Sequence, residues 1–596
     1  MKALGDPRGF LFYAGRIMKA QFDPLRKYVA EKIAAISDNM VSLPEAYDSL
    51  VEPPNPELGD LAFGCFPLAK ALRKGPPQIA ADLKNKLQVD AVIAEIQNVG
   101  PYLNFRFHSQ ALGDMFIEGV RKGEVFKQKL TVDSPRTMIE YSQPNTHKEL
   151  HVGHMRNMCL GDAIVRLLKY SNYDIISSTF PGDVGTHVAK CLWYMKYHNK
   201  EAAPATGKGE WLGRMYSLGN NKLEDEVGTP QEEKNRVILT EILKQLEEKK
   251  GEYFDLWKET REWSIELMKK VYEWGDVHFD QWYWESDVDS SSIQYIKKLQ
   301  AEGKLEVSQG AVGMNLEADK LGFCLLLKSD GTGLYATKDI ELARRKFQDH
   351  KIEKSVYVVD MRQALHFSQV FKVLEIIGFP QAKNCYHLQY NFVELPDGAM
   401  SSRKGNIVPL ITLIHNMEKM VKDQYLERYR GDWSETEIDL VASQVAKGAI
   451  RYGMLRIDNN KKIVFDMSEW LKIDGESGPF IQYSFARINS LCRKLGYKEG
   501  KVNYSLLNHE AERKLIQHLM NFNTVVVKAA EDYRPSMLCT YLYEAAKKFN
   551  YFYHECSIGQ AETEELKQAR LVLAFSTGQV LKQGLALLGI PVPERM

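Results

Sequence analysis

The stretch from Ile139 to Asp162 reads IEYSQPNTHKELHVGHMRNMCLGD, and it decides the fold expected of the domain around it. The short β-type run Met138–Tyr141 leads into a polar loop, which is followed by a helical pattern from His154 to Tyr170. A second β-type run, Ile175–Thr179, comes next. Strand, loop, helix and strand form a βαβ unit, whose strands are parallel and whose ligands bind beyond the carboxyl ends of the strands. The sequence therefore predicts an α/β domain.

The helix that follows the first strand begins with the tetrapeptide H-V-G-H. A helix N-terminus offers unpaired N–H groups and a positive dipole end, which favour an anion. Gly153 leaves room for a flat base, and His151 and His154 can donate hydrogen bonds to phosphate oxygens. Two alternatives stay open: the histidines cap or solvate the helix, or they form a metal pair, for which no third ligand lies nearby.

The same domain continues with three further β-type runs, Cys324–Lys328, Ser355–Val359 and Tyr386–Tyr390, which we expect to extend the parallel sheet. Lys222–Trp274, between Ile175–Thr179 and these runs, is helical, charged and contains tryptophans. Helices of this kind inside an α/β core are typical of an insertion. We therefore expect a domain over residues 130–425 with helical insertions at about residues 195–320.

Regions of different character flank this domain. Residues 1–125 predict an α+β module, with a helical pattern over Phe22–Ile36 and a turn into a strand over Val99–Phe107. Residues 426–596 are strongly helical and predict a bundle. Its expected helices include Gly478–Leu495, Glu510–Ala530, Leu538–Tyr553 and Glu564–Leu588.

The composition agrees with several domains in one chain. A chain of 596 residues is too long for a single core. With 44% hydrophobic and 26% charged residues, it is not a disordered, collagen-like or fibrous chain. Lys+Arg and Asp+Glu are both 78, so the net charge does not indicate a nucleic-acid partner. A local basic face would be sufficient to bind one.

The cysteines and apolar runs predict a cytoplasmic protein. The 8 cysteines are scattered without C-x-x-C spacing, which gives no support to a zinc site and fits a reducing compartment. No run approaches the roughly 18 apolar residues of a membrane span, so we expect no membrane partner. Gly9–Gly15 is apolar but short and lacks a basic lead, so we interpret it as non-signal. Met1 and Met18 are both candidate starts.

A second chemically informative stretch is Gly398–Asn406, GAMSSRKGN. It is small, polar and basic, and it follows a β-type run and a turn. Such a loop can close over a triphosphate, with Arg403 and Lys404 as cations and Ser401 and Ser402 as hydroxyl donors. By itself the stretch is also typical of an ordinary surface loop.

Together the two stretches resemble the class I aminoacyl-tRNA synthetases, whose signature motifs are HIGH and KMSKS. HVGH stands for the first motif, and AMSSRKGN lies in register with KMSKSKGN. Other stretches resemble the arginyl-tRNA synthetases in particular, over nearly the whole chain. These are EYSQPNTHKELHVGHMRN, PGDVGTH (Pro181–His187), LYATKDIELARRK (Leu334–Lys346), YVVDMRQALHFSQVF (Tyr357–Phe371), QYSFARI (Gln482–Ile488), NPELGDLAFGCFPLAK, GPYLNF and the ending PERM.

The resemblance implies a Rossmann-like catalytic domain between an N-terminal tRNA-binding domain and a C-terminal helical anticodon-binding domain. It also implies an arginine–tRNA ligase that uses ATP with Mg²⁺ as a substrate complex, together with L-arginine and tRNA(Arg). We expect no tightly bound metal or organic cofactor, and a monomer. In this family activation of arginine typically requires bound tRNA.

The resemblance also assigns site residues. Glu140, Asn145, Tyr335, Asp339 and Gln363 would surround arginine, whose guanidinium needs carboxylate acceptors in fork geometry. The residues assigned to ATP are His151, Gly153, His154, Gly182, Asp183, Gly185, His366, Gln369, Met400, Ser401 and Ser402. The expected catalytic cations and donors are Lys148, His151, His154 and Lys404. The residues expected to contact tRNA are Tyr102, Asn104, Tyr483, Arg487 and Met596.

Two departures from the family's pattern bear on these assignments. Ala399 and Ser402 stand where KMSKS has lysines, and Lys148, just before HVGH, is expected to supply the cation that Ser402 does not. Val184 and His187 stand where the family usually has Trp and Gln, which affects the expected contacts with ATP and arginine.

Three rival functions remain at this point. A nucleotidyltransferase of another kind could use H-x-G-H alone, but would not need the helical tail. A cysteinyl-type synthetase would be expected to show a Cys/His zinc cluster. The third rival is a catalytically inactive tRNA-binding or scaffold protein on the same fold, against which both signature motifs argue.

Overall fold

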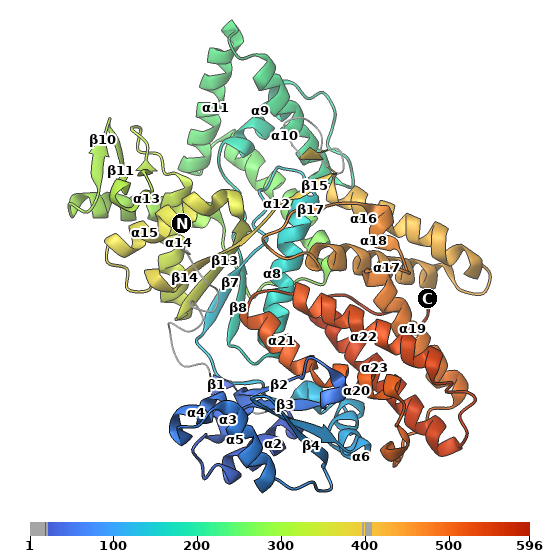
Figure 1. The fold of residues 1–596 in the computed structure, drawn as a ribbon. Coiled ribbons are helices and arrows are strands. Elements are labelled where there is room, and N and C mark those ends of the chain that lie inside the picture. Colours follow the sequence, from blue (N-terminus) through green and yellow to red (C-terminus); the bar gives the residue numbers. More distant parts are fainter. Residues whose placement is uncertain (1–17, 20–21, 396–397, 400–407) are drawn as a thin grey trace.

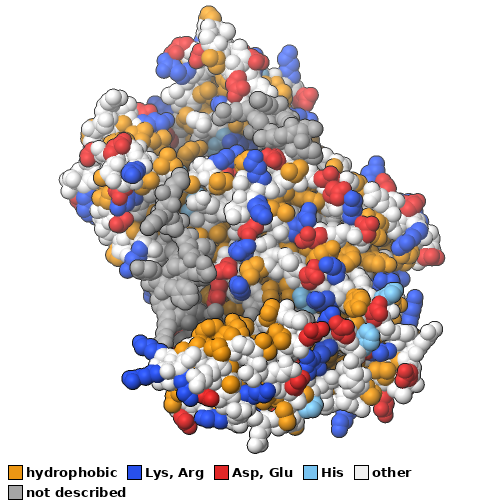
Figure 2. Space-filling model, viewed as in Figure 1, with side chains coloured by type: hydrophobic (Ala, Val, Ile, Leu, Met, Phe, Trp, Pro, Cys, Tyr) orange, Lys and Arg blue, Asp and Glu red, His pale blue; other side chains and the backbone are white. Residues whose placement is uncertain are grey.

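The computed structural model describes residues 18–19, 22–395, 398–399 and 408–596, so Met400, Ser401, Ser402, Arg403 and Lys404 lie outside the described residues. Three parts follow one another along the chain (Figure 1): an N-terminal α+β domain, a catalytic-type α/β domain and a helical C-terminal domain. Lys and Arg side chains are intermixed with Asp and Glu over the viewed face (Figure 2), in agreement with the balanced charge.

The N-terminal domain is built on a four-stranded antiparallel sheet in the order β2-β3-β5-β4. These strands are β2 (Leu50–Val51), β3 (Leu61–Gly64), β4 (Ile93–Val99) and β5 (Tyr102–Phe107). The predicted first helix is α2 (Pro24–Ile36), which Asp23 caps by accepting the Leu25 and Arg26 N–H groups at 3.0 Å. Helices α3 (Leu43–Asp48), α4 (Phe66–Leu72) and α5 (Pro76–Lys86) also belong to this domain.

The central domain contains a five-stranded parallel sheet in the order β14-β13-β7-β8-β9. The strands are β7 (Thr137–Glu140), β8 (Ile175–Thr179), β9 (Gln281–Trp282), β13 (Lys354–Asp360) and β14 (Cys385–Tyr390). Every residue of β7 and β8 is buried, as expected for a parallel sheet covered on both faces. The predicted βαβ unit is present, with α8 (Val152–Tyr170) between β7 and β8. The strand order reverses beside β7, so its carboxyl end opens into a crevice.

One predicted strand belongs to a different sheet. The run Cys324–Lys328 forms β12 (Phe323–Leu327), which pairs antiparallel with β11 (Ala311–Asn315) in the sheet β10-β11-β12 and not with the parallel core. β10 covers Glu306–Ser308. Along β12, Cys324 and Leu326 are buried while Phe323 and Leu325 are exposed. This alternation marks a strand covered on one face only, and the prediction was wrong because a short apolar run does not specify its partner.

The insertion is helical, as expected, but not throughout. The predicted segment Lys222–Trp274 resolves into the end of α10 (Lys208–Asp225), α11 (Pro230–Glu248) and α12 (Glu252–Gly275). Helices α9 (Thr186–Tyr197), α10 and α11 lie at the top of Figure 1, and α12 lies nearer the centre of the view. The later part of residues 195–320 adds α13 (Glu285–Ala301), the edge strand β9, β10 and β11. A two-residue strand such as β9 carries too little pattern to be recognised from sequence.

The C-terminal part is a helical bundle. Its helices are α17 (Glu435–Leu455), α19 (Gly478–Leu495), α20 (Glu510–Met520), α21 (Phe522–Glu531), α22 (Ser536–Glu555) and α23 (Glu564–Leu587). The single helix predicted over Glu510–Ala530 is two helices, because Asn521 ends α20. Helix α16 (Leu410–Val421) packs between this bundle and α8. Within the described residues, no helix is both long and apolar enough to cross a bilayer.

One buried guanidinium joins the central domain to the bundle. Arg451 of α17 is fully buried; its Nε donates to Leu588 O at 2.7 Å and its Nη1 to Gly275 O at 2.9 Å. Its Nη2 forms an ion pair with Asp162 of α8. The helix that begins with HVGH, the end of α12 and the end of α23 therefore meet at one side chain.

Candidate active site

A cavity of about 740 Å³ lies at the carboxyl end of the parallel sheet. Its walls come from the ends of β7, β13 and β14 and from the beginnings of α8, α14 (Tyr335–His350) and α15 (Ala364–Ile376). Residues far apart in the sequence meet here, and all those expected to surround arginine are among them. The predicted residues that line the cavity are Glu140, Asn145, His151, Gly153, His154, Gly182, Tyr335, Asp339, Gln363 and His366.

The two histidines of HVGH lie at the first turn of α8 and are locked to its backbone. His151 is the N-cap residue, and its Nδ1 accepts the Gly153 N–H at 3.1 Å. His154 Nδ1 accepts the His151 N–H at 3.1 Å, and the ring centroids are 4.0 Å apart. Because each Nδ1 is an acceptor, the proton of each neutral ring lies on Nε2. The capping alternative is therefore realised, and it leaves one N–H on each ring as a donor.

Burial keeps both of these imidazoles uncharged. It lowers the pKa of His151 to about 4, and the positive charges of Arg362 and Lys148 act in the same direction. Burial, His151 and Lys148 lower the pKa of His154 well below its usual range. At neutral pH these side chains can donate hydrogen bonds but carry no positive charge.

Lys148 is held by the helical insertion. Its Nζ lies 5.1 Å from the ring centroid of Tyr216 on α10. The preceding residue, His147, is fully buried in left-handed backbone conformation (φ 58°). Its N–H donates to Ser264 Oγ at 2.9 Å and its Nε2 lies 2.8 Å from Thr260 Oγ1, both on α12. The insertion thus fixes the loop that carries Lys148, and Lys148 itself is not among the described residues that line the cavity.

Glu140 is not an isolated anion. It is the last residue of β7 and is 3% exposed, and its carboxylate forms an ion pair with Lys346 of α14. Lys346 is fully buried, and its Nζ lies 3.9 Å from the ring centroid of Tyr357. Glu140 Oε1 accepts from Gln143 Nε2 at 3.2 Å. Lys346 ends one of the stretches that resemble the family, yet nothing in the sequence indicated its partner.

Asp339 faces the other wall of the cavity and pairs with His366, whose Nε2 lies 2.5 Å from Asp339 Oδ2. Burial alone would lower the pKa of His366, but the hydrogen bond and the negative charge of Asp339 outweigh it and raise this pKa. The residues assigned to arginine and to ATP are therefore already in contact.

Sequence reasoning missed two further acids that line the cavity, Glu285 and Asp360. Glu285, at the start of α13, is buried and forms an ion pair with Lys338 at 3.0 Å. A Cβ on Gly182 would lie 2.4 Å from Asn145 Oδ1 and 3.2 Å from Glu285 Oε1. Only glycine therefore allows these two oxygens to lie this close to the backbone at position 182. The available signal was an acid directly after the aromatic run Trp282–Trp284.

Some predicted residues lie beside the cavity. Asp183 is fully buried, and its carboxylate accepts from Arg261 Nε at 2.7 Å and from Ser286 N and Oγ at 2.9 and 2.7 Å. Gln369 Nε2 donates to Leu321 O at 2.7 Å. Gly185, with Val184, lines a neighbouring pocket of about 470 Å³. His187 is buried, with its Nε2 3.3 Å from Gly182 O.

The residues expected to contact tRNA differ in exposure. Tyr102 is 37% exposed and packs edge-on against exposed Phe66, with ring centroids 5.8 Å apart. Asn104 is buried, and its Nδ2 has no hydrogen-bond partner among the described residues. Arg487 is exposed and Tyr483 half-buried, whereas Met596 O accepts from Tyr429 Oη at 3.4 Å.

Comparison with known proteins decides the family. Residues 120–467 match the model for the catalytic domain of class I tRNA synthetases (R). The chain belongs to the arginyl-tRNA synthetase family. Residues 23–107 match the arginyl-tRNA synthetase N-terminal domain, and residues 481–596 match the DALR anticodon-binding domain. The predicted family and the three-part architecture are thereby confirmed.

Relatives agree over nearly the whole chain. The arginine–tRNA ligase of Bdellovibrio bacteriovorus is 64% identical and covers 94% of this chain and 96% of its own length. That of Clostridium beijerinckii is 35% identical over 95% of this chain and 99% of its own. The arginyl-tRNA synthetase of Thermus thermophilus superposes with a TM-score of 0.78 at 28% identity, covering 96% of this chain and all of its own.

The arginyl-tRNA synthetase activates L-arginine with ATP and transfers it to the 3′ end of its tRNA, releasing AMP and pyrophosphate. The predicted function is thus confirmed, and the rival assignments to another nucleotidyltransferase, another synthetase or an inactive scaffold fall away. In the described part of the chain, no cluster of three or more His, Cys, Asp or Glu side chains could hold a metal ion.

Proposed function

We propose that the 740 Å³ cavity is where arginine and ATP meet, with the arginine side chain toward β7 and α14 and the triphosphate toward the first turn of α8. The observation that carries this proposal is the convergence of four acidic side chains with the two neutral histidines of HVGH in one cavity; the acids are Glu140, Glu285, Asp339 and Asp360. A guanidinium and an ammonium are the groups that such carboxylates suit, and a helix N-terminus suits a phosphate.

At the arginine end, Asp339 and Glu140 bind the guanidinium, with Tyr335 and Gln363 beside it. Arginine then competes with His366 for Asp339 and shares Glu140 with Lys346. Asn145 Oδ1 and Glu285 Oε1, held close by Gly182, accept the α-ammonium group. Lysine presents a single point charge and is rejected, whereas canavanine keeps a fork of N–H donors and is a weaker substrate.

At the phosphate end, no enzyme nucleophile is required. The arginine carboxylate attacks the α-phosphorus of ATP, and the bond to the leaving pyrophosphate breaks. The Nε2–H groups of His151 and His154 donate to the α-phosphate, and Gly153 lets the base approach the backbone. Lys148 and Lys404 supply positive charge, and Met400, Ser401, Ser402 and Gly185 complete the ATP contacts. Mg²⁺ enters with ATP and is held by phosphate oxygens and water.

In the second step, the terminal ribose hydroxyl of tRNA(Arg) attacks the carbonyl carbon of the adenylate and AMP leaves. The unpartnered Nδ2 of buried Asn104 and the exposed ring of Tyr102 favour recognition of an unpaired base. Tyr483, Arg487 and Met596 contact tRNA from the helical domain.

We further propose that the enzyme is a cytoplasmic monomer with domains at residues 1–125, 130–425 and 426–596. Its eight cysteines are free, buried thiols, as suits a reducing compartment.

The experiment that tests the site is ATP–pyrophosphate exchange with arginine, canavanine or lysine, with and without tRNA(Arg). We expect exchange in the order arginine, canavanine, lysine, and a strong requirement for tRNA. Robust exchange without tRNA would contradict the tRNA requirement. Equal rates with lysine would contradict the carboxylate assignment, and light scattering of the purified protein tests the monomer.

A further inference from the structure

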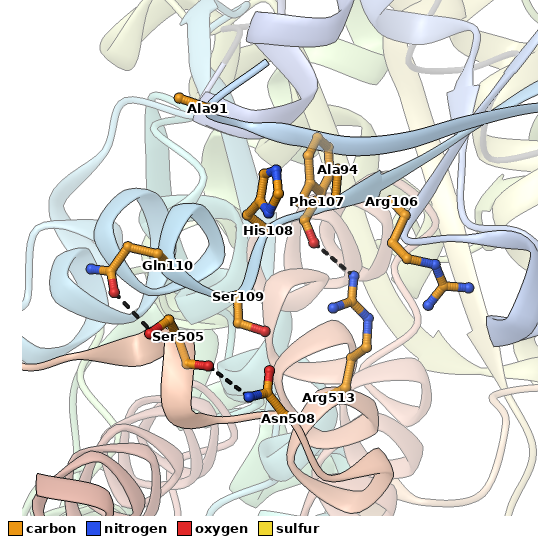
Figure 3. A pocket seen from close by; sticks show the side chains of 10 residues that line it. All are labelled: Ala91, Ala94, Arg106, Phe107, His108, Ser109, Gln110, Ser505, Asn508 and Arg513. Atoms are coloured by element: carbon orange, nitrogen blue, oxygen red, sulfur yellow. Dashed lines mark hydrogen bonds between the residues drawn. The ribbon is translucent and has the colours of Figure 1, made fainter. Parts of the chain in front are cut away.

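One buried carboxylate takes part in the junction between the N-terminal domain and the helical domain. Asp60 directly precedes β3, and its carboxylate is fully buried. Within its own domain it accepts the Phe107 N–H at 2.7 Å. From α20 of the helical domain it accepts Gln517 Nε2 at 2.5 Å and pairs with Arg513 Nη2. Arg513 Nη2 also donates to Phe107 O at 3.0 Å (Figure 3).

Beside the contact between Asp60 and Arg513, a gap separates the two domains. A cleft of about 490 Å³ opens between them (Figure 3), with Arg106, His108 and Gln110 on one side and Ser505, Asn508 and Arg513 on the other. Other hydrogen bonds cross the junction: Ser109 Oγ donates to Leu507 O at 3.1 Å, Asn521 Nδ2 to Glu52 Oε2 at 2.9 Å, and Tyr504 Oη to Glu118 Oε1. Each of these contacts involves at most one charged group. The Asp60–Arg513 contact joins two charges and its carboxylate is out of water, so it is harder to break, because the separated charges would remain desolvated.

Asp60 lies at the opposite end of a strand pair from the exposed aromatic edge. Leu61, its neighbour, pairs with Phe105, whereas Gly64 at the other end of β3 pairs with Tyr102. Three residue steps along a strand separate the two ends by about 10 Å. A hydrogen-bonded strand pair is stiff, so a rotation of the domain about Asp60 moves the edge formed by Phe66 and Tyr102.

We propose that Asp60 is a positioning residue for tRNA: by binding Arg513 and Gln517 it sets the orientation of the N-terminal domain, and thereby the distance between the Phe66–Tyr102 edge and the helical domain. The inference rests on the proposed contact of Tyr102 with tRNA. A rigid nucleic acid that touches both domains binds well only if that distance is preset, since otherwise binding has to order the junction.

The test compares Asp60→Asn with a matched control in the full-length enzyme. Asparagine keeps the shape but loses the charge, and its amide N–H groups oppose the Arg513 donor. Glu512→Gln is the control: Glu512 neighbours Arg513 on α20 and its carboxylate is equally buried, but its partner, Arg570 at 2.7 Å, lies within the same domain. Both variants lose a buried charge pair, and only one of them loosens the junction.

We expect Asp60→Asn to raise the KM for tRNA about tenfold in aminoacylation. The kcat and the KM values for arginine and ATP at saturating tRNA should stay within about twofold. Glu512→Gln should lower the thermal midpoint without raising the KM for tRNA. Asp60→Asn with Arg513→Met removes both charges; it should recover stability but not the KM. An unchanged KM in Asp60→Asn, or an equal rise in both single variants, would overturn the proposal.

A distance measurement separates this inference from the proposed tRNA contact. Spin labels at two exposed positions, Val89 in the N-terminal domain and His554 in the helical domain, report the junction without tRNA. We expect a narrow distance distribution in the otherwise unchanged enzyme and a broad one with Asp60→Asn. An unchanged distance distribution in Asp60→Asn would show that Asp60 does not hold the orientation of the N-terminal domain. A broad distribution together with an unchanged KM, and no effect of Tyr102→Ala on KM, would instead overturn the tRNA contact of the N-terminal domain.

Discussion

His151 and His154 lie on one wall of the cavity and His366 lies on the opposite wall, and their surroundings move the imidazole pKa in opposite directions. Burial lowers the pKa of His151 to about 4 and that of His154 well below its usual range. His366 is half-buried, and its contact with Asp339 raises its pKa. A carboxylate partner therefore shifts the pKa of a histidine in this cavity upwards, whereas burial without such a partner shifts it downwards.

The difference divides the chemistry of the cavity. The wall at α8 offers neutral N–H donors, so the positive charge that a triphosphate needs has to come from other side chains, such as Lys148 or Arg362. The wall at α14 and α15 offers carboxylates that are already paired with basic side chains, so arginine has to displace or share a partner. The following predictions challenge this division, beginning with the largest expected effect.

Glu140→Gln tests the deepest of the paired carboxylates. It leaves Lys346 buried without its anion, and we expect a loss of about 3–5 kcal/mol in the free energy of unfolding, measured with urea. The double variant Glu140→Gln with Lys346→Met should recover much of that loss. Asp339→Asn is the matched comparison. Its loss in the free energy of unfolding should be smaller, because His366 can release its proton when its carboxylate partner is removed. Equal losses in the two single variants would contradict the difference between the walls.

Lys148→Ala tests the source of positive charge. We expect the barrier to adenylate formation to rise by about 2–4 kcal/mol, the scale of one lost transition-state donor, with little change in arginine affinity. Pre-steady-state adenylate formation measures it. Lys222→Ala is the control, since Lys222 lies on α10, the helix of Tyr216, but pairs with Glu226 at 2.8 Å. A normal rate of adenylate formation in Lys148→Ala would show that other side chains stabilise the negative charge of the phosphates.

The neutral state of His151 predicts a pH dependence of stability. An unfolded histidine takes up a proton near pH 6.5 while His151 stays neutral to about pH 4, so the unfolded state binds more protons in this window and stability falls as the pH falls. Between about pH 7 and pH 5 this residue should account for a loss of about 1–2 kcal/mol. Unfolding free energies of the wild type and of His151→Gln, compared at both pH values, measure it. Parallel pH profiles would show that His151 is charged in the folded protein.

His366 predicts the opposite sign and a smaller effect. Its raised pKa means that its protonated form stabilises the fold below about pH 6.5, and that this contribution is lost as the pH rises through the folded pKa. The same deprotonation weakens the hold of His366 on Asp339, so the KM for arginine should fall about three- to tenfold from about pH 6 to pH 8.5. His366→Gln should flatten this dependence. A wild-type KM that rises with pH would contradict the competition for Asp339.

The local features of this enzyme could be predicted from its sequence. The βαβ unit around Ile139–Asp162, the start of the helix at HVGH and the helical C-terminal part follow from periodicities and from helix-start chemistry that act within a few residues. The resemblance of ordered stretches also led to the residues that line the cavity, because a family's ligand contacts stay attached to its motifs.

Partners that lie far apart in the sequence come together only in the folded chain. Lys346 pairs with Glu140, Glu285 pairs with Lys338, β12 joins a separate antiparallel sheet, and Asp60 binds Arg513 across a domain junction. None of these pairings has a local signature, since each depends on chain segments that meet only on folding. Charge state follows the same logic: His151 and His366 are the same residue type, and burial with or without a neighbouring carboxylate moves their pKa values apart.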